Sequence, residues 1–343
     1  MNRFVLQKER FFQTIKTGYL KGEVNVKIKL LEPLRVPDKM IEDLSQPLKD
    51  LGHEFEYYNE KTTDTAELIE RSQGADVVMI ANNPYPGEVI EASDNLQLIN
   101  VAFTGVDHVD KETAKLKGVK IANAAGYSNQ AVAELVIGLT LDLYRGITQG
   151  DSDIRQADFP GPFQGSEIKD KTVGIIGTGK IGTMTAKLFK AFGANVIGYN
   201  RSEHEEAKEL GLTYVGLEEL MEQSDIVSIH LPLNEETRGI ISKDLLAKMK
   251  PSAVLINCAR GPIIDNDALA ESLNKGEIAG AGIDVFDMEP PLPMDYSLLN
   301  AKNAVLAPHV GFLTDEAMVL RAHIAFKNTL AFVKGQPQNI VQD

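Results

Sequence analysis

Three glycines, Gly177, Gly179 and Gly182, have the G-x-G-x-x-G spacing of a loop that binds a dinucleotide pyrophosphate. The first would permit a tight turn, the second would let the backbone approach the pyrophosphate, and the third would let a helix lie close to a strand. The helix N-terminus would offer N–H groups and a positive dipole to the phosphates. A glycine turn without a ligand is the alternative. It is disfavoured because apolar strand-like runs, 173–176 and 195–199, flank the motif.

Three later loops each carry one residue suited to carbonyl chemistry, namely Arg260, Glu289 and His309. Hydride transfer to a carbonyl needs a proton donor, and histidine suits that role near neutral pH. A neighbouring carboxylate holds the imidazole and favours its protonated form. An arginine can clamp a substrate carboxylate through two parallel hydrogen bonds and polarise the adjacent carbonyl. Each residue alone is more often solvated or structural, but the ordered set behind a glycine motif favours an oxidoreductase.

The elements that would position these groups alternate between strands and helices in two series. In the second series we predict helices at 217–223, from the cap Ser242 to Met249, and at 266–274 with Asp265 as its cap. Repeated β-α-β order predicts parallel sheets with helices on both faces. We therefore predict an α/β protein with two doubly wound parallel-sheet domains and a cleft between them. Ligands of such sheets bind beyond the carboxyl ends of the strands. This rule places residues 82–85 and 104–106 on a candidate cleft wall.

The predicted substrate domain is discontinuous and comprises residues 24–122 and 312–335. Residues 123–311 form the predicted dinucleotide-binding domain, and residues 1–23 form an N-terminal extension without an assigned function. A helix at residues 314–333 follows the last strand of the second series. We expect this helix to return to the first domain.

Composition limits the possible partners. The chain of 343 residues has a net charge of −14, which argues against nucleic acid and anionic membrane surfaces as partners. Its one cysteine, Cys258, excludes an internal disulfide and fits a reducing compartment. No apolar run approaches the length of a membrane span. The single cysteine and the lack of a membrane-length apolar run therefore lead us to expect a cytoplasmic location. No pair of histidines has metal-binding spacing, so we predict no metal.

From about Val24 to its C-terminal helix, the chain resembles the D-isomer-specific 2-hydroxyacid dehydrogenase family. The order of several motifs makes this resemblance specific. The motifs that carry it are Gly177-Thr178-Gly179-Lys180-Ile181-Gly182, His230-Leu231-Pro232 with Thr237, Asn257-Cys258-Ala259-Arg260-Gly261, Gly282-Ile283-Asp284-Val285-Phe286, Glu289-Pro290, Pro308-His309-Val310-Gly311, Gly105-Val106-Asp107 and Ala131-Val132-Ala133-Glu134.

The resemblance implies a flavodoxin-like substrate domain, a Rossmann dinucleotide-binding domain and a homodimer formed through the latter. It implies that His309 is the acid/base, that Glu289 is its partner, and that Arg260 binds the substrate carboxylate and carbonyl. Backbone N–H groups at Thr104 and Gly105 would complete the carboxylate site. The implied cofactor contacts are Gly177, Gly179, Lys180, Ile181, Gly182, Asn200, Arg201, Ser202, Leu231, Pro232, Thr237, Cys258, Ala259, Arg260, Asp284, His309 and Gly311.

The chain departs from the expected pattern at the end of the second dinucleotide strand. An NAD enzyme would carry Asp or Glu near Asn200 to bind the ribose 2′-hydroxyl. Asn200, Arg201 and Ser202 stand there instead. The missing carboxylate removes repulsion of a 2′-phosphate, and Arg201 can pair with that phosphate. We therefore expect NADP or NAD, with NADP slightly favoured. In the alternative, Arg201 points to solvent.

The expected reaction joins a 2-oxo acid and a D-2-hydroxy acid, as in glyoxylate and hydroxypyruvate reductases or D-lactate dehydrogenases. The sequence does not name the acid. A phosphite dehydrogenase-like oxidoreductase stays open because it would keep the same three residues. A dinucleotide-sensing, corepressor-like regulatory protein also stays open. Cys258 has no adjacent histidine, so we interpret it as a small residue that lines the nicotinamide pocket.

Overall fold

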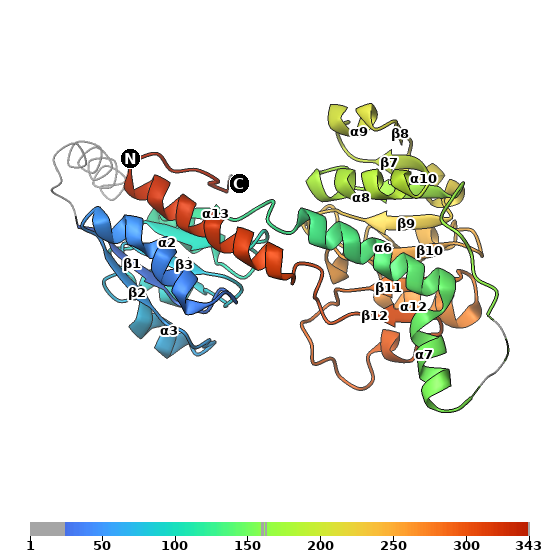
Figure 1. Cartoon of the computed structure of the whole chain (residues 1–343), viewed down its shortest axis with the longest axis horizontal. Coiled ribbons are helices and arrows are strands. Elements are labelled where there is room, and N and C mark those ends of the chain that lie inside the picture. The colour runs from blue at the N-terminus through green and yellow to red at the C-terminus, as the bar shows by residue number, and fades with distance from the viewer. Residues whose placement is uncertain (1–24, 159–160, 162, 342–343) are drawn as a thin grey trace. The chain divides into compact units, whose positions relative to one another are not determined.

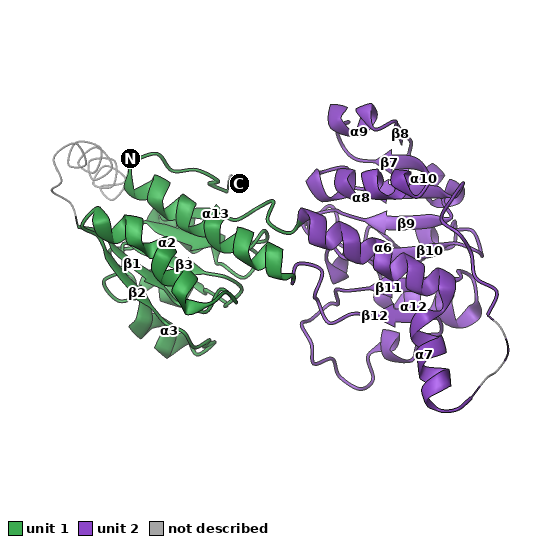
Figure 2. Ribbon diagram, viewed as in Figure 1, with its two compact units in different colours: residues 1–128, 314–343 green, residues 129–313 purple. Residues whose placement is uncertain are grey.

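The computed structural model describes residues 25–158, 161 and 163–341. The predicted N-terminal extension, residues 1–23, lies outside the described residues. The chain divides into two compact units (Figure 2): unit 1 comprises residues 1–128 and 314–343, and unit 2 comprises residues 129–313. The boundary that we placed between residues 122 and 123 lies a few residues before the division at 128/129.

Unit 1 contains a five-stranded sheet in which every pair of strands is parallel. Its order, β2-β1-β3-β4-β5, is that of flavodoxin-like sheets. The central strands are apolar because helices cover both of their faces. The strands are β1 (Lys27–Leu30), β2 (Glu54–Tyr57), β3 (Val77–Ile80), β4 (Leu98–Val101) and β5 (Lys120–Asn123).

Helices pack on both faces of this sheet. Alternate residues of β3 enter different cores, Val77 and Met79 on one face and Val78 and Ile80 on the other. Helices α2 and α13 cover the first core, and α3, α4 and α5 cover the second. The helices are α2 (Asp38–Asp50), α3 (Thr65–Ser72), α4 (Gly87–Glu91), α5 (Lys111–Lys117) and α13 (Asp315–Val333).

The last helix, α13, is part of unit 1 although it follows unit 2 in the chain. It contacts α2 and β4, and Figure 1 shows it beside α2. The buried Asn100 side chain of β4 donates hydrogen bonds to the Ala325 carbonyl at 2.7 Å and to Thr329 Oγ1 at 2.8 Å. Phe326 packs against Phe55 with ring centroids 5.5 Å apart. Unit 1 is therefore assembled from two distant segments of sequence.

Unit 2 contains a seven-stranded parallel sheet of order β12-β11-β10-β9-β6-β7-β8. Counted within this unit, the order is 3-2-1-4-5-6, that of a Rossmann fold, with one further strand at the edge. The predicted α/β fold class with two doubly wound parallel sheets is confirmed. The strands are β6 (Thr172–Ile176), β7 (Asn195–Tyr199), β8 (Thr213–Tyr214), β9 (Ile226–Ile229), β10 (Val254–Asn257), β11 (Gly280–Ile283) and β12 (Ala304–Leu306).

Two cores lie on opposite faces of this second sheet. One core lies under α6 (Asn129–Arg145) and α8 (Lys180–Ala191). The other lies under α10 (Leu217–Gln223), α11 (Lys243–Leu246) and α12 (Asn266–Lys275). The structure also contains α9 (Glu205–Glu209), the 3-10 helices Gly261–Ile263 and Ser297–Asn300, and α7 (Ile147–Arg155). We did not predict α7, which contains no buried residue.

Candidate functional site

The glycine motif lies between β6 and α8, and its three glycines meet different surroundings. A Cβ on Gly177 would lie 2.7 Å from the His230 carbonyl oxygen, and one on Gly182 would lie 1.9 Å from the Gly177 carbonyl oxygen. Gly177 also has a φ of +95°, which favours glycine. A Cβ on Gly179 would meet nothing within 4 Å. The fold itself therefore requires the first and third glycines, whereas the second borders open space.

This open space fits the pyrophosphate of a dinucleotide. Gly179 is the N-cap of α8, and no side chain caps the helix there. The first N–H groups of a helix need a partner outside it, and a phosphate can supply one. Lys180, the first residue of α8, pairs with Glu206 at 2.7 Å and is exposed. The residues present at this turn therefore fit a dinucleotide.

The loop after β7 carries the residues predicted to meet the adenosine ribose. Asn200 Nδ2 donates to the Ser202 carbonyl at 2.8 Å. Arg201 Nη1 lies 3.0 Å from Glu236 Oε2, in an ion pair that is exposed on both sides. Arg201 is therefore paired with a carboxylate that our interpretation of the sequence did not include.

Arg260, Glu289 and His309 follow three neighbouring strands, β10, β11 and β12. These strands are parallel, with Asn257 opposite Ile283 and Ile283 opposite Leu306. The loops after parallel strands leave the sheet at one edge, where ligands of doubly wound folds bind. The fold thus brings the three predicted catalytic residues to the edge that the glycine turn after β6 also occupies.

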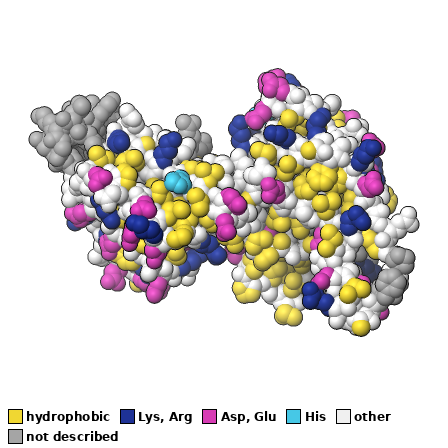
Figure 3. Space-filling view, in the orientation of Figure 1, with side chains coloured by type: hydrophobic (Ala, Val, Ile, Leu, Met, Phe, Trp, Pro, Cys, Tyr) yellow, Lys and Arg dark blue, Asp and Glu magenta, His cyan; other side chains and the backbone are white. Residues whose placement is uncertain are grey.

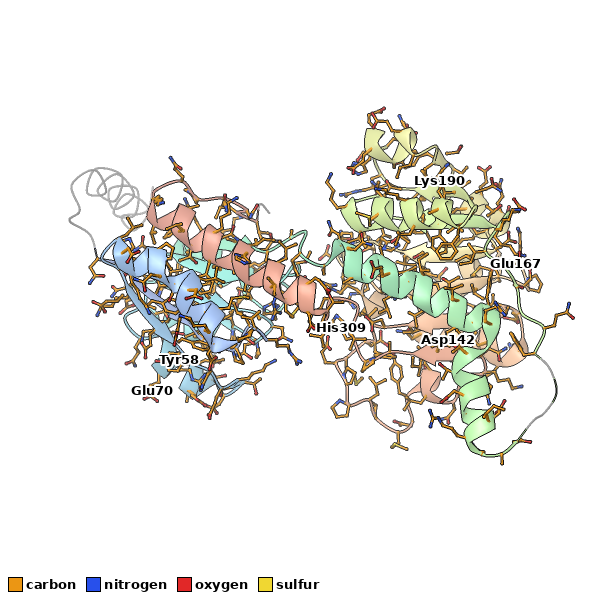
Figure 4. All side chains as sticks on the ribbon, in the orientation of Figure 1. Tyr58, Glu70, Asp142, Glu167, Lys190 and His309 are labelled. Carbon is orange, nitrogen blue, oxygen red and sulfur yellow. The ribbon has the colours of Figure 1, made fainter. Side chains whose placement is uncertain are left out.

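His309 and Glu289 are in direct contact. His309 Nδ1 lies 2.8 Å from Glu289 Oε1 and 3.0 Å from Glu289 Oε2. The imidazole also meets the Phe312 ring edge-on, with centroids 5.5 Å apart. His309 lies on the segment between β12 and α13 (Figure 4). Because Glu289 engages Nδ1, Nε2 is the nitrogen that can exchange a proton with a substrate.

The backbone around His309 is held by Asp284. His309 has a φ of +56°, a conformation that costs energy in a residue with a side chain. Asp284, 1 % exposed, accepts hydrogen bonds from Val310 N and Gly311 N, both at 2.8 Å. Burial raises the pKa of the Asp284 carboxyl, although these two hydrogen bonds oppose the shift. A Cβ on Gly311 would lie 2.9 Å from Asp284 Oδ2, so glycine permits this close approach.

Asn257, at the end of β10, fixes the loop that bears Arg260. Its Oδ1 accepts from Ala259 N at 3.0 Å, and its Nδ2 donates to the Arg260 carbonyl at 3.0 Å. Arg260 Nη1 donates to the Ala259 carbonyl at 2.7 Å. We quoted Asn257 only as part of a motif and gave it no role. The available signal was a polar residue at the end of a buried apolar strand.

Two further candidate residues, Cys258 and His230, are both uncharged near neutral pH. Burial, with the Asp284 charge as a second cause, raises the pKa of Cys258 well above its usual value. The thiol therefore stays protonated and is a poor nucleophile. Burial lowers the pKa of His230 to about 3, and its Nε2 lies 2.8 Å from Ser228 Oγ. His230 is therefore a neutral imidazole beside the glycine turn.

The remaining predicted residues lie in two loops. In unit 2, Thr237 Oγ1 donates to the Pro232 carbonyl at 2.7 Å in the loop that follows β9 and Leu231. In unit 1, the Thr104 carbonyl accepts from Asn123 Nδ2 at 2.8 Å, next to Gly105.

Among residues 25–158, 161 and 163–341, no group of three or more His, Cys, Asp or Glu side chains could hold a metal ion. In the same ranges no helix is long and apolar enough to cross a membrane.

Known proteins match this chain over most of its length. The family model of the D-isomer specific 2-hydroxyacid dehydrogenase NAD binding domain matches residues 137–311. A glyoxylate reductase of Thermofilum pendens is 37% identical over 278 residues, which are 79% of this chain and 82% of that protein. A hydroxypyruvate reductase of Blautia hydrogenotrophica is 35% identical over 301 residues, 86% of this chain and 93% of that protein.

A solved structure extends the likeness to three dimensions. It is the acyclic imino acid reductase Bsp5 in complex with NADPH and D-Arg, with a TM-score of 0.82 and 31% identity. The match covers 92% of this chain and 100% of that one. The glycine turn and the doubly wound sheets are features of dinucleotide-binding folds, in agreement with these matches. The chain belongs to the family of D-isomer-specific 2-hydroxyacid dehydrogenases, NAD(P)-dependent oxidoreductases that act on a CH–OH group.

Proposed function

We propose that the chain reduces a short 2-oxo acid, glyoxylate or hydroxypyruvate, to the corresponding 2-hydroxy acid. The contact between His309 Nδ1 and the Glu289 carboxylate carries this proposal. It supplies an oriented proton donor at the sheet edge that also bears the glycine turn. The names of the two relatives described above, a glyoxylate reductase and a hydroxypyruvate reductase, support the choice of acid.

In the proposed reaction the nicotinamide, when bound, supplies the hydride. His309 Nε2 donates a proton to the carbonyl oxygen as negative charge develops there. Glu289 holds the imidazole through Nδ1 and so fixes Nε2 as the nitrogen that exchanges the proton. The Arg260 guanidinium binds the substrate carboxylate and polarises the carbonyl. The N–H groups of Thr104 and Gly105 complete the carboxylate site in this proposal.

We propose that both NADPH and NADH are used, with NADPH slightly favoured. No carboxylate directly follows β7, since Asn200 stands there. A 2′-phosphate therefore meets no acidic side chain at that position, and Arg201 is the nearest cation in sequence. The pairing of Arg201 with Glu236 limits this preference, because the guanidinium already has an anionic partner.

The test of the catalytic proposal compares substitutions at two residues, His309 and Arg260. Loss of reduced nicotinamide absorbance would be followed with glyoxylate and hydroxypyruvate. His309→Gln should lower kcat by about 10²- to 10⁴-fold with little change in KM, because it removes the proton donor. Arg260→Gln should raise KM and also lower kcat, because the guanidinium binds both the ground state and the transition state. Full activity of His309→Gln would refute the mechanism.

A second outcome would change the proposed function itself. Tight dinucleotide binding without turnover of any 2-oxo acid would favour a phosphite dehydrogenase-like enzyme or a dinucleotide-sensing regulatory protein. Phosphite supplied together with the oxidised cofactor separates these two, because its oxidation would transfer a hydride to the cofactor and raise the reduced nicotinamide absorbance.

We also propose a homodimer formed through unit 2. Helix α7 has no buried residue and exposes Ile147 (57%) and Ile154 (69%), and the nearby loop exposes Phe163 (65%). Such apolar side chains commonly enter protein interfaces. Sedimentation of the purified chain at the monomer mass would refute the dimer.

The proposed setting is the cytoplasm, without nucleic acid or membrane partners. The net charge of −14 supports this, since both of those partners attract basic surfaces. Acidic and basic side chains are interspersed over the face shown in Figure 3, with no extended basic field.

A further inference from the structure

The exposed ion pair between Arg201 and Glu236 joins two loops that are far apart in sequence. Arg201 follows β7, and Glu236 lies in the loop after β9, 35 residues later. Their nitrogen and oxygen atoms are 3.0 Å apart, and the side chains are 80% and 71% exposed. An ion pair this exposed is weak, so a stronger anionic partner can displace the carboxylate.

The two loops are held in place by bonds that do not involve this pair. The Tyr214 hydroxyl lies 2.6 Å from Thr178 Oγ1 and accepts from His204 N at 2.9 Å. In the loop after β9, Asn234 Oδ1 accepts hydrogen bonds from Glu236 N at 3.0 Å and from Thr237 N at 2.9 Å. Removal of the Glu236 carboxylate should therefore free the Arg201 guanidinium without moving either loop.

We propose that Glu236 determines how strongly the enzyme discriminates between NADPH and NADH. This inference rests on the proposed placement of the cofactor adenosine beside Arg201. A 2′-phosphate offers the guanidinium a dianionic, bidentate partner. The Glu236 carboxylate opposes that contact twice, because it occupies Arg201 and because it repels the phosphate. A cofactor with a free 2′-hydroxyl meets neither effect.

The experiment measures binding of two adenosine fragments and both reduced cofactors by calorimetry. The fragments are adenosine 2′,5′-bisphosphate and AMP, which differ in the 2′-phosphate alone. Glu236→Gln should lower the Kd of the bisphosphate and of NADPH by roughly tenfold. The Kd values of AMP and NADH should stay within about twofold of wild type.

Two control variants separate a local contact from a general change in charge. Glu235→Gln removes the same charge from the neighbouring exposed residue. It should change the bisphosphate Kd by less than about twofold, because exposed charges at greater distance are screened. Arg201→Gln should weaken the bisphosphate by about tenfold, and in that background Glu236→Gln should have a smaller effect.

Equal effects of Glu236→Gln and Glu235→Gln on the bisphosphate would overturn the inference, as would an unchanged ratio of the bisphosphate and AMP affinities. These outcomes are distinct from failure of the proposed function. That failure would appear as an absence of 2-oxo acid turnover, whereas fragment binding needs no turnover.

Discussion

The glycine turn permits a sharp test, because Gly179 and Gly182 respond differently to one added methyl group. Gly179→Ala places a Cβ in open space, at a φ of −67° that alanine tolerates. The free energy of unfolding should change by less than about 1 kcal/mol and could increase, because alanine reduces the entropy of the unfolded chain. The methyl group should nevertheless obstruct the pyrophosphate. Loss of one charge-assisted hydrogen bond, about 1.5–3 kcal/mol, would raise the cofactor Kd by roughly 10- to 100-fold.

Gly182→Ala should have the opposite profile. Its Cβ would lie 1.9 Å from the Gly177 carbonyl oxygen, so β6 and α8 must separate. Overpacking of this kind costs about 1–3 kcal/mol or more of unfolding free energy. Urea denaturation without cofactor would measure stability, and calorimetric titration with NADPH would measure affinity. The reasoning fails if Gly179→Ala binds NADPH as wild type does, or if both variants lose the same stability.

Two further predictions concern stability. The pKa of His230 is about 3 in the folded chain, whereas an unfolded histidine titrates near 6.5. The free energy of unfolding is therefore highest above pH 6.5 and decreases as the pH falls below that value. Between pH 7.5 and 5.0, protonation of His230 in the unfolded chain should lower the free energy of unfolding by about 2 kcal/mol. In urea denaturation, His230→Asn should therefore lose about 2 kcal/mol less than wild type over this pH range. Asn100→Ala should lower the unfolding free energy of unit 1 by about 2–4 kcal/mol, because it leaves the Ala325 carbonyl and Thr329 hydroxyl unpaired. An unchanged urea midpoint for this variant would contradict the role given to Asn100 in joining α13 to β4.

Strong local signals made most of the fold predictable. The helix predicted at 217–223 has the same bounds as α10. Asp265 caps α12, as its side chain accepts from Ala268 N at 3.0 Å. Repeated β-α-β order was enough to predict parallel sheets, because crossover connections of that kind leave few other topologies.

Weak or short signals were missed. Ser242 caps α11 as expected, but the helix ends at Leu246 and not at the predicted Met249. Helix α7 contains Gly150 and has only two large apolar residues, Ile147 and Ile154, so its helical pattern is too short and weak to be recognised in the sequence. It follows Gly146, which adopts a φ of +58° and ends the preceding helix.

The candidate site could be predicted in part. Motif order indicated which loops bear Arg260, Glu289 and His309, and the structure shows the contact between His309 and Glu289. The catalytic roles of these residues stay predictions. The pairing of Arg201 with Glu236 could not be predicted, because it depends on how two loops after different strands approach each other.

The return of α13 to unit 1 affects the order in which the chain can fold during synthesis. Residues 129–313 are contiguous, so unit 2 can form as soon as it leaves the ribosome. Unit 1 must wait for α13, which supplies Ala322, Ala325, Phe326 and Phe332 to its core. At a synthesis rate of about 5–20 residues per second, the N-terminal segment of unit 1 is made roughly 10–40 s before α13. During this interval the part of the sheet that α13 covers would be exposed, which is an apolar surface that chaperones can shield.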